Sequence, residues 1–116
     1  MANQFNRLPP QDLKAERGVL SSIILRPAML DEVTPVLRSE MFHIDANGKI
    51  FDALAEMSVN GIGIDGGTLA SHLERHGIIE EIGGEDYIVQ LITAEPHAAH
   101  AKFYAMEVRD RWTQRQ

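Results

Sequence analysis

The chain has 116 residues, no cysteine, 44% apolar residues and a formal net charge of −6. This length and composition fit one globular domain, and no apolar run is long enough to cross a bilayer. The lack of cysteine excludes disulfides, thiolate zinc sites and cysteine nucleophiles, and it fits a cytoplasmic location. The acidic balance argues against an extended nucleic-acid surface, because phosphate binding depends on clustered Lys and Arg. We therefore expect a protein partner, no membrane contact and only weak binding of single-stranded DNA.

Residues 1–8 predict a flexible N-terminal arm, and residues 9–116 predict one helical domain. The arm has one basic residue and no apolar stretch of the kind found in signal peptides. The first helix spans about 11–25, because its apolar residues recur at helical spacing. These residues are Leu13, Val19, Leu20, Ile23 and Ile24.

A short second helix is predicted to start at Pro27, because a missing amide hydrogen costs little in a first turn. Its apolar face consists of Leu30, Val33 and Leu37. Pro35 comes late in this helix and should bend or shorten it, since proline disrupts a helix interior. The turn that follows is expected to place Phe42 in the core.

A third helix is predicted over about 45–59 and ends at Asn60-Gly61. Its buried residues are expected to be Ile50, Phe51, Leu54 and Met57. The fourth helix starts at Asp65, whose side chain, together with that of Thr68, can cap the exposed amides of the first turn. Gly77 ends it, because glycine readily adopts the left-handed conformation of a helix stop.

Gly83-Gly84 then turns the chain into a fifth helix, which carries Tyr87, Ile88, Leu91 and Ile92. The final helix is predicted over about 97–115, with Ala99, Phe103, Met106 and Trp112 facing inward. No segment shows the sustained alternation of a strand, so we predict an all-α, compact bundle of about six helices. Residues 108–116 contain no glycine or proline stop. We therefore expect no helix stop within these residues.

Residues 61–66 read Gly-Ile-Gly-Ile-Asp-Gly, which is the G-x-G-x-x-G spacing of dinucleotide-binding loops. That pattern binds a pyrophosphate only when it follows a strand and opens a helix in a βαβ unit. The preceding residues predict a helix instead. We interpret the motif as the stop of one helix, an extended connection and the cap of the next, and we expect no cofactor.

Four histidines form two close pairs, His72 with His76 and His97 with His100. Each spacing can place both rings on one helix face, but a zinc site needs three or four ligands. We interpret the histidines as partly exposed surface residues and expect no metal ligand among them. A small helical metal enzyme built on two converging pairs is the alternative from the enzyme class.

The sequence contains no motif that would bind or transfer phosphate. There is no G-x-x-x-x-G-K-[ST] loop, and Gly66-Gly67-Thr68 lacks the lysine that would reach the β and γ phosphates. Paired acids lie near predicted helix ends or turns, where solvation and the helix dipole explain them. We therefore predict that this chain catalyses nothing by itself.

An ordered series of short motifs runs from about residue 8 to residue 108. It consists of Leu8-Pro9-Pro10-Gln11, Ala15-Glu16, Val19-Leu20, Ile50-Phe51, Gly61, Ile64-Asp65, Thr68-Leu69, Leu73, Ile82-Gly83-Gly84, Tyr87, Leu91, Pro96, Tyr104-Ala105 and Val108. In this order and spacing, the series resembles the N-terminal domain of bacterial replicative DNA helicases of the DnaB type.

The resemblance implies an all-helical collar domain that precedes a linker and a RecA-like motor, where ATP and Mg would bind. It also implies that subunits pair through a C-terminal helical hairpin and build a hexameric trimer-of-dimers ring. By the same resemblance, we expect the last helix to be the start of this hairpin, with the chain ending inside it. Primase and, in some systems, a loader protein would dock on this domain. The helicase-binding domain of a primase, which is similar in fold, is a second alternative.

Four positions depart from the family pattern. Asn47 stands where the family commonly has a histidine before Ile-Phe, and His100 stands where it commonly has asparagine. Lys14 replaces a usual acidic residue, and Ser21-Ser22 replaces a glycine-containing run. These departures concern partner-specific contacts more than the fold.

Six residues are candidates for a partner interface. They are Lys14, Tyr87, Arg109, Arg111, Trp112 and Arg115. An exposed tryptophan among arginines has the composition of an interface hot spot, and Val108 and Trp112 share one helix face. In the alternative, Trp112 folds back onto the bundle. The resemblance implies that Tyr87 lies near the surface that meets primase.

Overall fold

The computed structural model describes residues 12–94 and 100–116, which form six α-helices and no β-strand. The helices are α1 (Leu13–Leu25), α2 (Leu30–Val33), α3 (Asp45–Val59), α4 (Gly66–Arg75), α5 (Gly84–Thr93) and α6 (Ala101–Arg115). Short 3₁₀ turns occur at Pro27–Met29, Ser39–Met41 and Glu80–Ile82. The predicted all-α bundle is confirmed, whereas the predicted arm at 1–8 lies outside the described residues.

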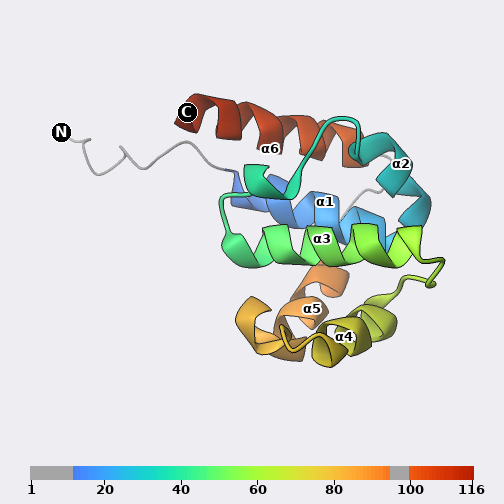
Figure 1. Ribbon diagram of the computed structural model, residues 1–116. Helices are drawn as coiled ribbons and strands as arrows, with labels where there is room; N and C mark the ends of the chain where they lie inside the picture. The colour runs from blue at the N-terminus through green and yellow to red at the C-terminus, as the bar shows by residue number, and fades with distance from the viewer. Residues whose placement is uncertain (1–11, 95–99) are drawn as a thin grey trace.

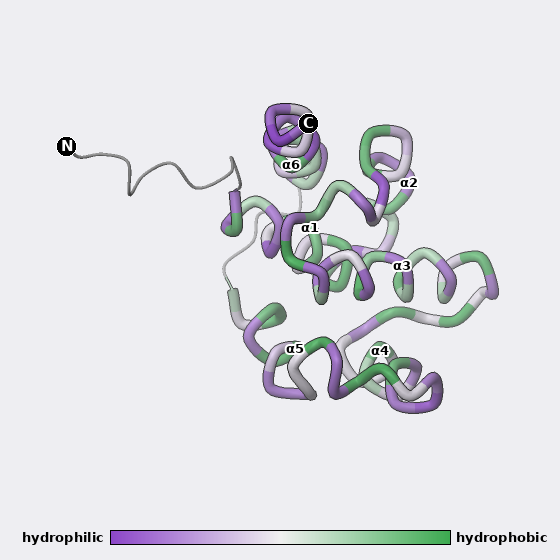
Figure 2. The backbone as a smooth tube through the Cα atoms, turned by 60° about the vertical axis from the view of Figure 1, so that its left-hand side comes forward, coloured by the Kyte–Doolittle hydropathy of each residue, from purple (hydrophilic) through white to green (hydrophobic). Residues whose placement is uncertain are grey.

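Helices α1 and α3 lie side by side in the middle of the molecule (Figure 1). Helix α6 packs along the other side of α1, runs in the opposite direction and lies next to α2. Helices α4 and α5 lie on the far side from α6, and Figure 2 shows the same separation from a second direction. Among the described helices, none is long and apolar enough to span a membrane. The bundle therefore has two opposite faces, one formed by α6 and the other by α4 and α5.

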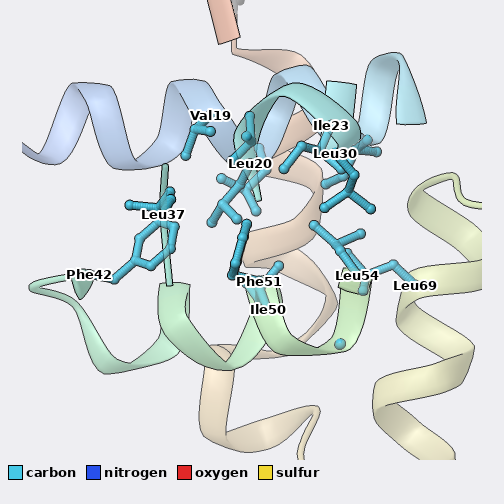
Figure 3. Close-up of a cluster of buried hydrophobic side chains, with 14 of the residues drawn as sticks. Val19, Leu20, Ile23, Leu30, Leu37, Phe42, Ile50, Phe51, Leu54 and Leu69 are labelled. Carbon is cyan, nitrogen blue, oxygen red and sulfur yellow. The ribbon is translucent and has the colours of Figure 1, made fainter. Parts of the chain in front are cut away.

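The core lies mainly between α1 and α3 (Figure 3). Its labelled side chains are Val19, Leu20, Ile23, Leu30, Leu37, Phe42, Ile50, Phe51, Leu54 and Leu69. All are 6% exposed or less, and the rings of Phe42 and Phe51 lie 5.5 Å apart between centroids. Burial of side chains of this size stabilises the fold by about 1.5–3 kcal/mol each. The predicted inward residues of the first and third helices are confirmed, except that Leu13 is only half-buried.

Helix α2 is short because Pro35 follows it closely. The helix ends at Val33, and the amide of Leu37 then bonds to the Val33 carbonyl at 3.0 Å. Proline has no amide hydrogen with which to continue the helical bonding. The prediction that Pro35 shortens this helix is confirmed, and the turn that follows buries Phe42 as expected.

The motif at 61–66 links two helices, as the sequence predicts. Gly61 follows the end of α3 with a left-handed φ of 71°, and Asp65 caps α4. The Asp65 carboxylate accepts a bond from the Thr68 amide at 2.8 Å, and the Thr68 hydroxyl accepts one from the Asp65 amide at 2.9 Å. Gly77, with a φ of 73°, follows the end of the helix. No strand precedes the motif, so the fold around it is not that of a dinucleotide-binding loop.

Helix α6 is rotated about its axis relative to the prediction. Its buried residues are Ala101, Ala105 and Val108. Phe103 is 60% exposed and Met106 39% exposed, so the prediction that they face inward is wrong. Gly18 of α1 makes room for the Tyr104 ring, because a Cβ at this position would lie 3.0 Å from the ring. The inward position predicted for Ala99 lies outside the described residues.

A buried carboxylate joins three parts of the bundle. Glu16 of α1 is 1% exposed, and its oxygens accept bonds from the His43 amide at 2.6 Å and the Ile44 amide at 3.2 Å. They also accept a bond from the Asn47 side-chain amide at 2.9 Å. The Asn47 carbonyl oxygen in turn accepts a bond from the Tyr87 hydroxyl of α5. This chain of hydrogen bonds fixes the start of α3 relative to both α1 and α5.

We expect Glu16→Ala to lower the free energy of unfolding by about 3 kcal/mol, because one buried and two partly buried donors would lose a charged acceptor. For a domain of this size, that loss corresponds to a melting temperature lower by roughly 10 °C or more. Thermal circular dichroism measures the difference directly. Glu32→Ala, at an exposed position on α2, is the matched control and should change little. Equal melting temperatures for the two variants would show that the carboxylate is not needed for stability.

Candidate functional site

Four of the predicted interface residues lie on the second half of α6, where all four are half-buried. They are Arg109, Arg111, Trp112 and Arg115. Trp112 packs against the hydrophobic core, and the guanidinium carbon of Arg38 lies 5.7 Å from the centre of its ring. Arg115 donates a hydrogen bond to the Met41 carbonyl at 2.9 Å. The prediction that Trp112 is exposed is therefore wrong, because its side chain folds back onto the bundle.

The other two candidates lie away from this cluster. Lys14 is exposed in the first turn of α1, and Tyr87 is half-buried on α5. Burial raises the pKa of the Tyr87 hydroxyl above its usual value, although the Arg17 guanidinium partly offsets this. The hydroxyl therefore stays protonated at neutral pH and donates to Asn47. Tyr87 contributes to the structure as well as to the surface.

These six residues do not form one continuous surface. Helix α5, with Tyr87, and helix α6, with the arginines, lie on opposite sides of the layer formed by α1 and α3 (Figures 1 and 2). A partner that contacts Tyr87 would therefore meet a different face of the bundle from one that contacts α6.

The exposed apolar side chains of α6 are Phe103 and Met106, which we call the α6 outer face. They are three residues apart, so they are neighbours on the helix surface, away from the buried alanines. Sequence reasoning missed this face because it assigned both side chains to the core. A signal was present: Ala101, Ala105, Val108 and Trp112 form a continuous stripe at helical spacing.

A second exposed apolar area, which we call the α5 edge, consists of Leu25, Val89 and Ile92. Leu25 is 65% exposed, Val89 50% and Ile92 48%. Leu25 and Ile92 line a hollow of about 410 Å³ between the end of α1 and the start of α4. Contiguous exposed apolar side chains of this kind commonly mark protein contacts.

The two histidines of the first predicted pair differ in exposure. His72 is 3% exposed, so the expectation of a surface residue is wrong for it, whereas His76 is exposed. Their ring centroids lie 4.2 Å apart. Glu56 of α3 contacts the buried ring, since its Oε1 lies 3.1 Å from Nε2 of His72. His97 lies outside the described residues, so convergence of the two predicted pairs is not described.

An all-helical bundle with two separate apolar surfaces is a suitable frame for protein contacts. The model of the DnaB-like helicase N terminal domain matches residues 8–110 of this chain. The chain therefore belongs to the family of DnaB-like helicase N-terminal domains.

Relatives and a solved structure agree with this assignment. The replicative DNA helicase DnaB of Mycobacterium leprae is 38% identical over 90% of this chain and 17% of its own length. That of Geobacillus stearothermophilus is 36% identical over 90% of this chain and 23% of its own length. The N-terminal domain of DnaB helicase from Mycobacterium tuberculosis superposes with a TM-score of 0.90 at 35% identity, covering 93% of this chain and 78% of that one. The chain thus spans about a fifth of these helicases.

We expect Trp112→Ala to destabilise the domain by about 1–2 kcal/mol, which is less than the cost of removing a fully buried tryptophan. The loss has two sources, namely the contact with the core and the stacked Arg38 guanidinium. Urea unfolding followed by circular dichroism measures the change. Thr113→Ala, at the next and exposed position, is the control. If both variants unfold at the same urea concentration, the packing of Trp112 contributes nothing.

Proposed function

We propose that this chain is the non-catalytic assembly and partner-docking domain of a hexameric replicative DNA helicase. The match to the family over residues 8–110 carries the proposal. The parent protein would unwind DNA by hydrolysing ATP with Mg in a separate motor domain. This domain would form the collar of the ring and receive primase and, where one exists, a helicase loader.

The α6 outer face is the part of the molecule best suited to assembly. Phe103 is 60% exposed although it is a large aromatic side chain, and Met106 lies beside it. Aromatic residues and methionine are enriched at protein interfaces relative to other surfaces. A second copy that covers these side chains would remove them from water. We propose that α6 begins the hairpin through which subunits pair.

The opposite face is suited to docking a different partner. The α5 edge exposes Leu25, Val89 and Ile92, and Tyr87 lies on the same helix as two of them. Because this face lies across the bundle from α6, primase or a loader could bind it while α6 is engaged in assembly. The helicase-binding domain of a primase remains the rival proposal, and the family match favours the helicase side.

We expect the purified chain to be monomeric at low micromolar concentration and to dimerise when concentrated. Phe103→Ser should weaken the dimer about tenfold, because an exposed apolar anchor is lost from the interface. Sedimentation velocity at matched concentrations measures the dimer fraction.

The matched control for self-association is Val59→Ser at the end of α3, where an apolar side chain is 86% exposed on another part of the surface. It should leave the dimer unchanged. Trp112→Ala should weaken the dimer less than Phe103→Ser does, because Trp112 packs within its own subunit. Equal dimer fractions for Phe103→Ser and wild type would remove the α6 outer face from the interface.

We further expect the chain neither to hydrolyse ATP nor to bind it tightly, because its sequence has no phosphate-binding loop. Single-stranded DNA should bind only weakly at physiological salt, given the net charge of −6. Phosphate release and titration of fluorescent nucleotide and oligonucleotide probes are the measurements. ATP turnover by the purified chain, or submicromolar affinity for DNA, would contradict the proposed division between collar and motor.

A further inference from the structure

Three side chains from two helices converge on one point of the surface. Glu56 lies on α3, while His72 lies on α4 and His76 directly follows that helix. One potential ligand atom of each lies within 4.8 Å of those of the other two. In the part of the chain that the structure describes, Glu56, His72 and His76 form the one group of three acidic or histidine side chains whose ligand atoms lie close enough together to hold a metal ion. The sequence indicates the pair of histidines but not the third residue, because Glu56 is 16 residues before His72.

The hydrogen bonding of His76 leaves one of its nitrogens free to bind a ligand. Its Nδ1 lies 2.8 Å from the backbone carbonyl oxygen of His72, so Nδ1 carries the proton and donates it. The lone pair is then on Nε2. Histidines that bind metals are commonly oriented by this kind of bond from the second ring nitrogen to a backbone carbonyl.

His72 is the buried member of the group. Its Nε2 lies 3.1 Å from Glu56 Oε1, and its Nδ1 is buried without a hydrogen-bond partner. Buried polar atoms without a partner are uncommon in proteins and call for an explanation. Because a carboxylate only accepts, Nε2 donates its proton to Glu56 in this contact, and the lone pair of the neutral ring lies on Nδ1. A cation bound between Glu56 and Nε2 would take the place of that proton, because metal binding to an imidazole nitrogen releases the proton that it carries.

The surroundings also favour a cation. The three residues line a hollow of about 190 Å³ together with Asp52, which lies one turn before Glu56 on α3. The C-terminal end of α4 meets the same place, because His76 is its C-cap residue. Carbonyl groups at a helix C-terminus carry partial negative charge and favour cations. Lys49 also lines the hollow, but it pairs with Asp45 and Glu81 at 3.1 and 2.7 Å.

We propose that Glu56, His72 and His76 form a binding site for a divalent transition metal of the zinc class. Two imidazoles and one carboxylate are a ligand set that zinc uses, with a water in the remaining position. The ion would connect α3 to α4 and so fasten the face formed by α4 and α5 to the core. This site is separate from the α6 outer face and goes beyond the proposed assembly function.

An ordinary ion pair between His72 and Glu56 is the competing explanation. It accounts for the 3.1 Å contact, but it does not use the free Nε2 of His76. Variants at His76 therefore separate the two explanations, because the ion pair between His72 and Glu56 does not use the Nε2 atom of His76.

The test is titration of the purified chain with Zn²⁺ by isothermal calorimetry, with Mg²⁺ as a hard-cation comparison. We expect one Zn²⁺ per chain and a higher melting temperature in its presence, since a ligand that binds the folded state stabilises it. His76→Ala and Glu56→Gln should each weaken Zn²⁺ binding at least tenfold, because each removes one ligand. Both side chains are exposed, so these variants should fold, whereas replacement of buried His72 would confuse the two effects.

His43→Ala is the matched control, because it removes an exposed imidazole from another part of the surface. It should bind Zn²⁺ as tightly as the wild type does. Binding of equal strength in His76→Ala and wild type would overturn the proposal, as would no binding at about 0.1 mM free Zn²⁺. Sedimentation of the same variants without metal keeps this result distinct from the assembly proposal, because the site is not part of the α6 outer face.

Discussion

The buried carboxylate of Glu16 is the interaction on which the arrangement of this bundle depends. It accepts bonds from two backbone amides just before α3 and from the side-chain amide of Asn47. The side-chain carbonyl oxygen of Asn47 accepts a further bond from the Tyr87 hydroxyl. Helix α3 has no side-chain cap of its own at Ile44, so a residue of α1 satisfies an amide at this end instead. A charge that is 1% exposed is tolerated only with such a full set of donors. The direction of α3, and with it the position of α4, follows from this contact.

The second constraint is the close contact between α1 and α6. Gly18 leaves room for the Tyr104 ring, and the alanines of α6 let the two backbones approach. Because the small residues occupy the inside, the larger apolar residues Phe103 and Met106 are left outside. The same packing that stabilises the monomer therefore creates an apolar surface on its outer side.

Much of the fold was predictable from local chemistry. The stop at Gly61, the cap at Asp65, and the shortening of α2 by Pro35 depend on residues close in sequence, and all three are confirmed. The rotation of α6 was not predicted, because the large apolar residues Phe103 and Met106 were assigned to the core in preference to the stripe of smaller residues that the helix buries. The burial of His72 and its contact with Glu56 depend on how α3 packs against α4. Distances of this kind are set by tertiary packing and leave no periodic pattern in a single sequence.

The two faces of the bundle can act independently because the central layer of α1 and α3 separates them. Covering the α6 outer face changes nothing on the α5 edge unless the central layer moves, and its tightly packed core resists such movement. The Glu56–His72–His76 group bridges the central layer and α4, so an ion bound there would act on the face opposite to α6. It would restrict how α4 and α5 sit against the core while leaving subunit pairing unaffected. A metal at this position would therefore affect the α5 edge rather than the α6 outer face.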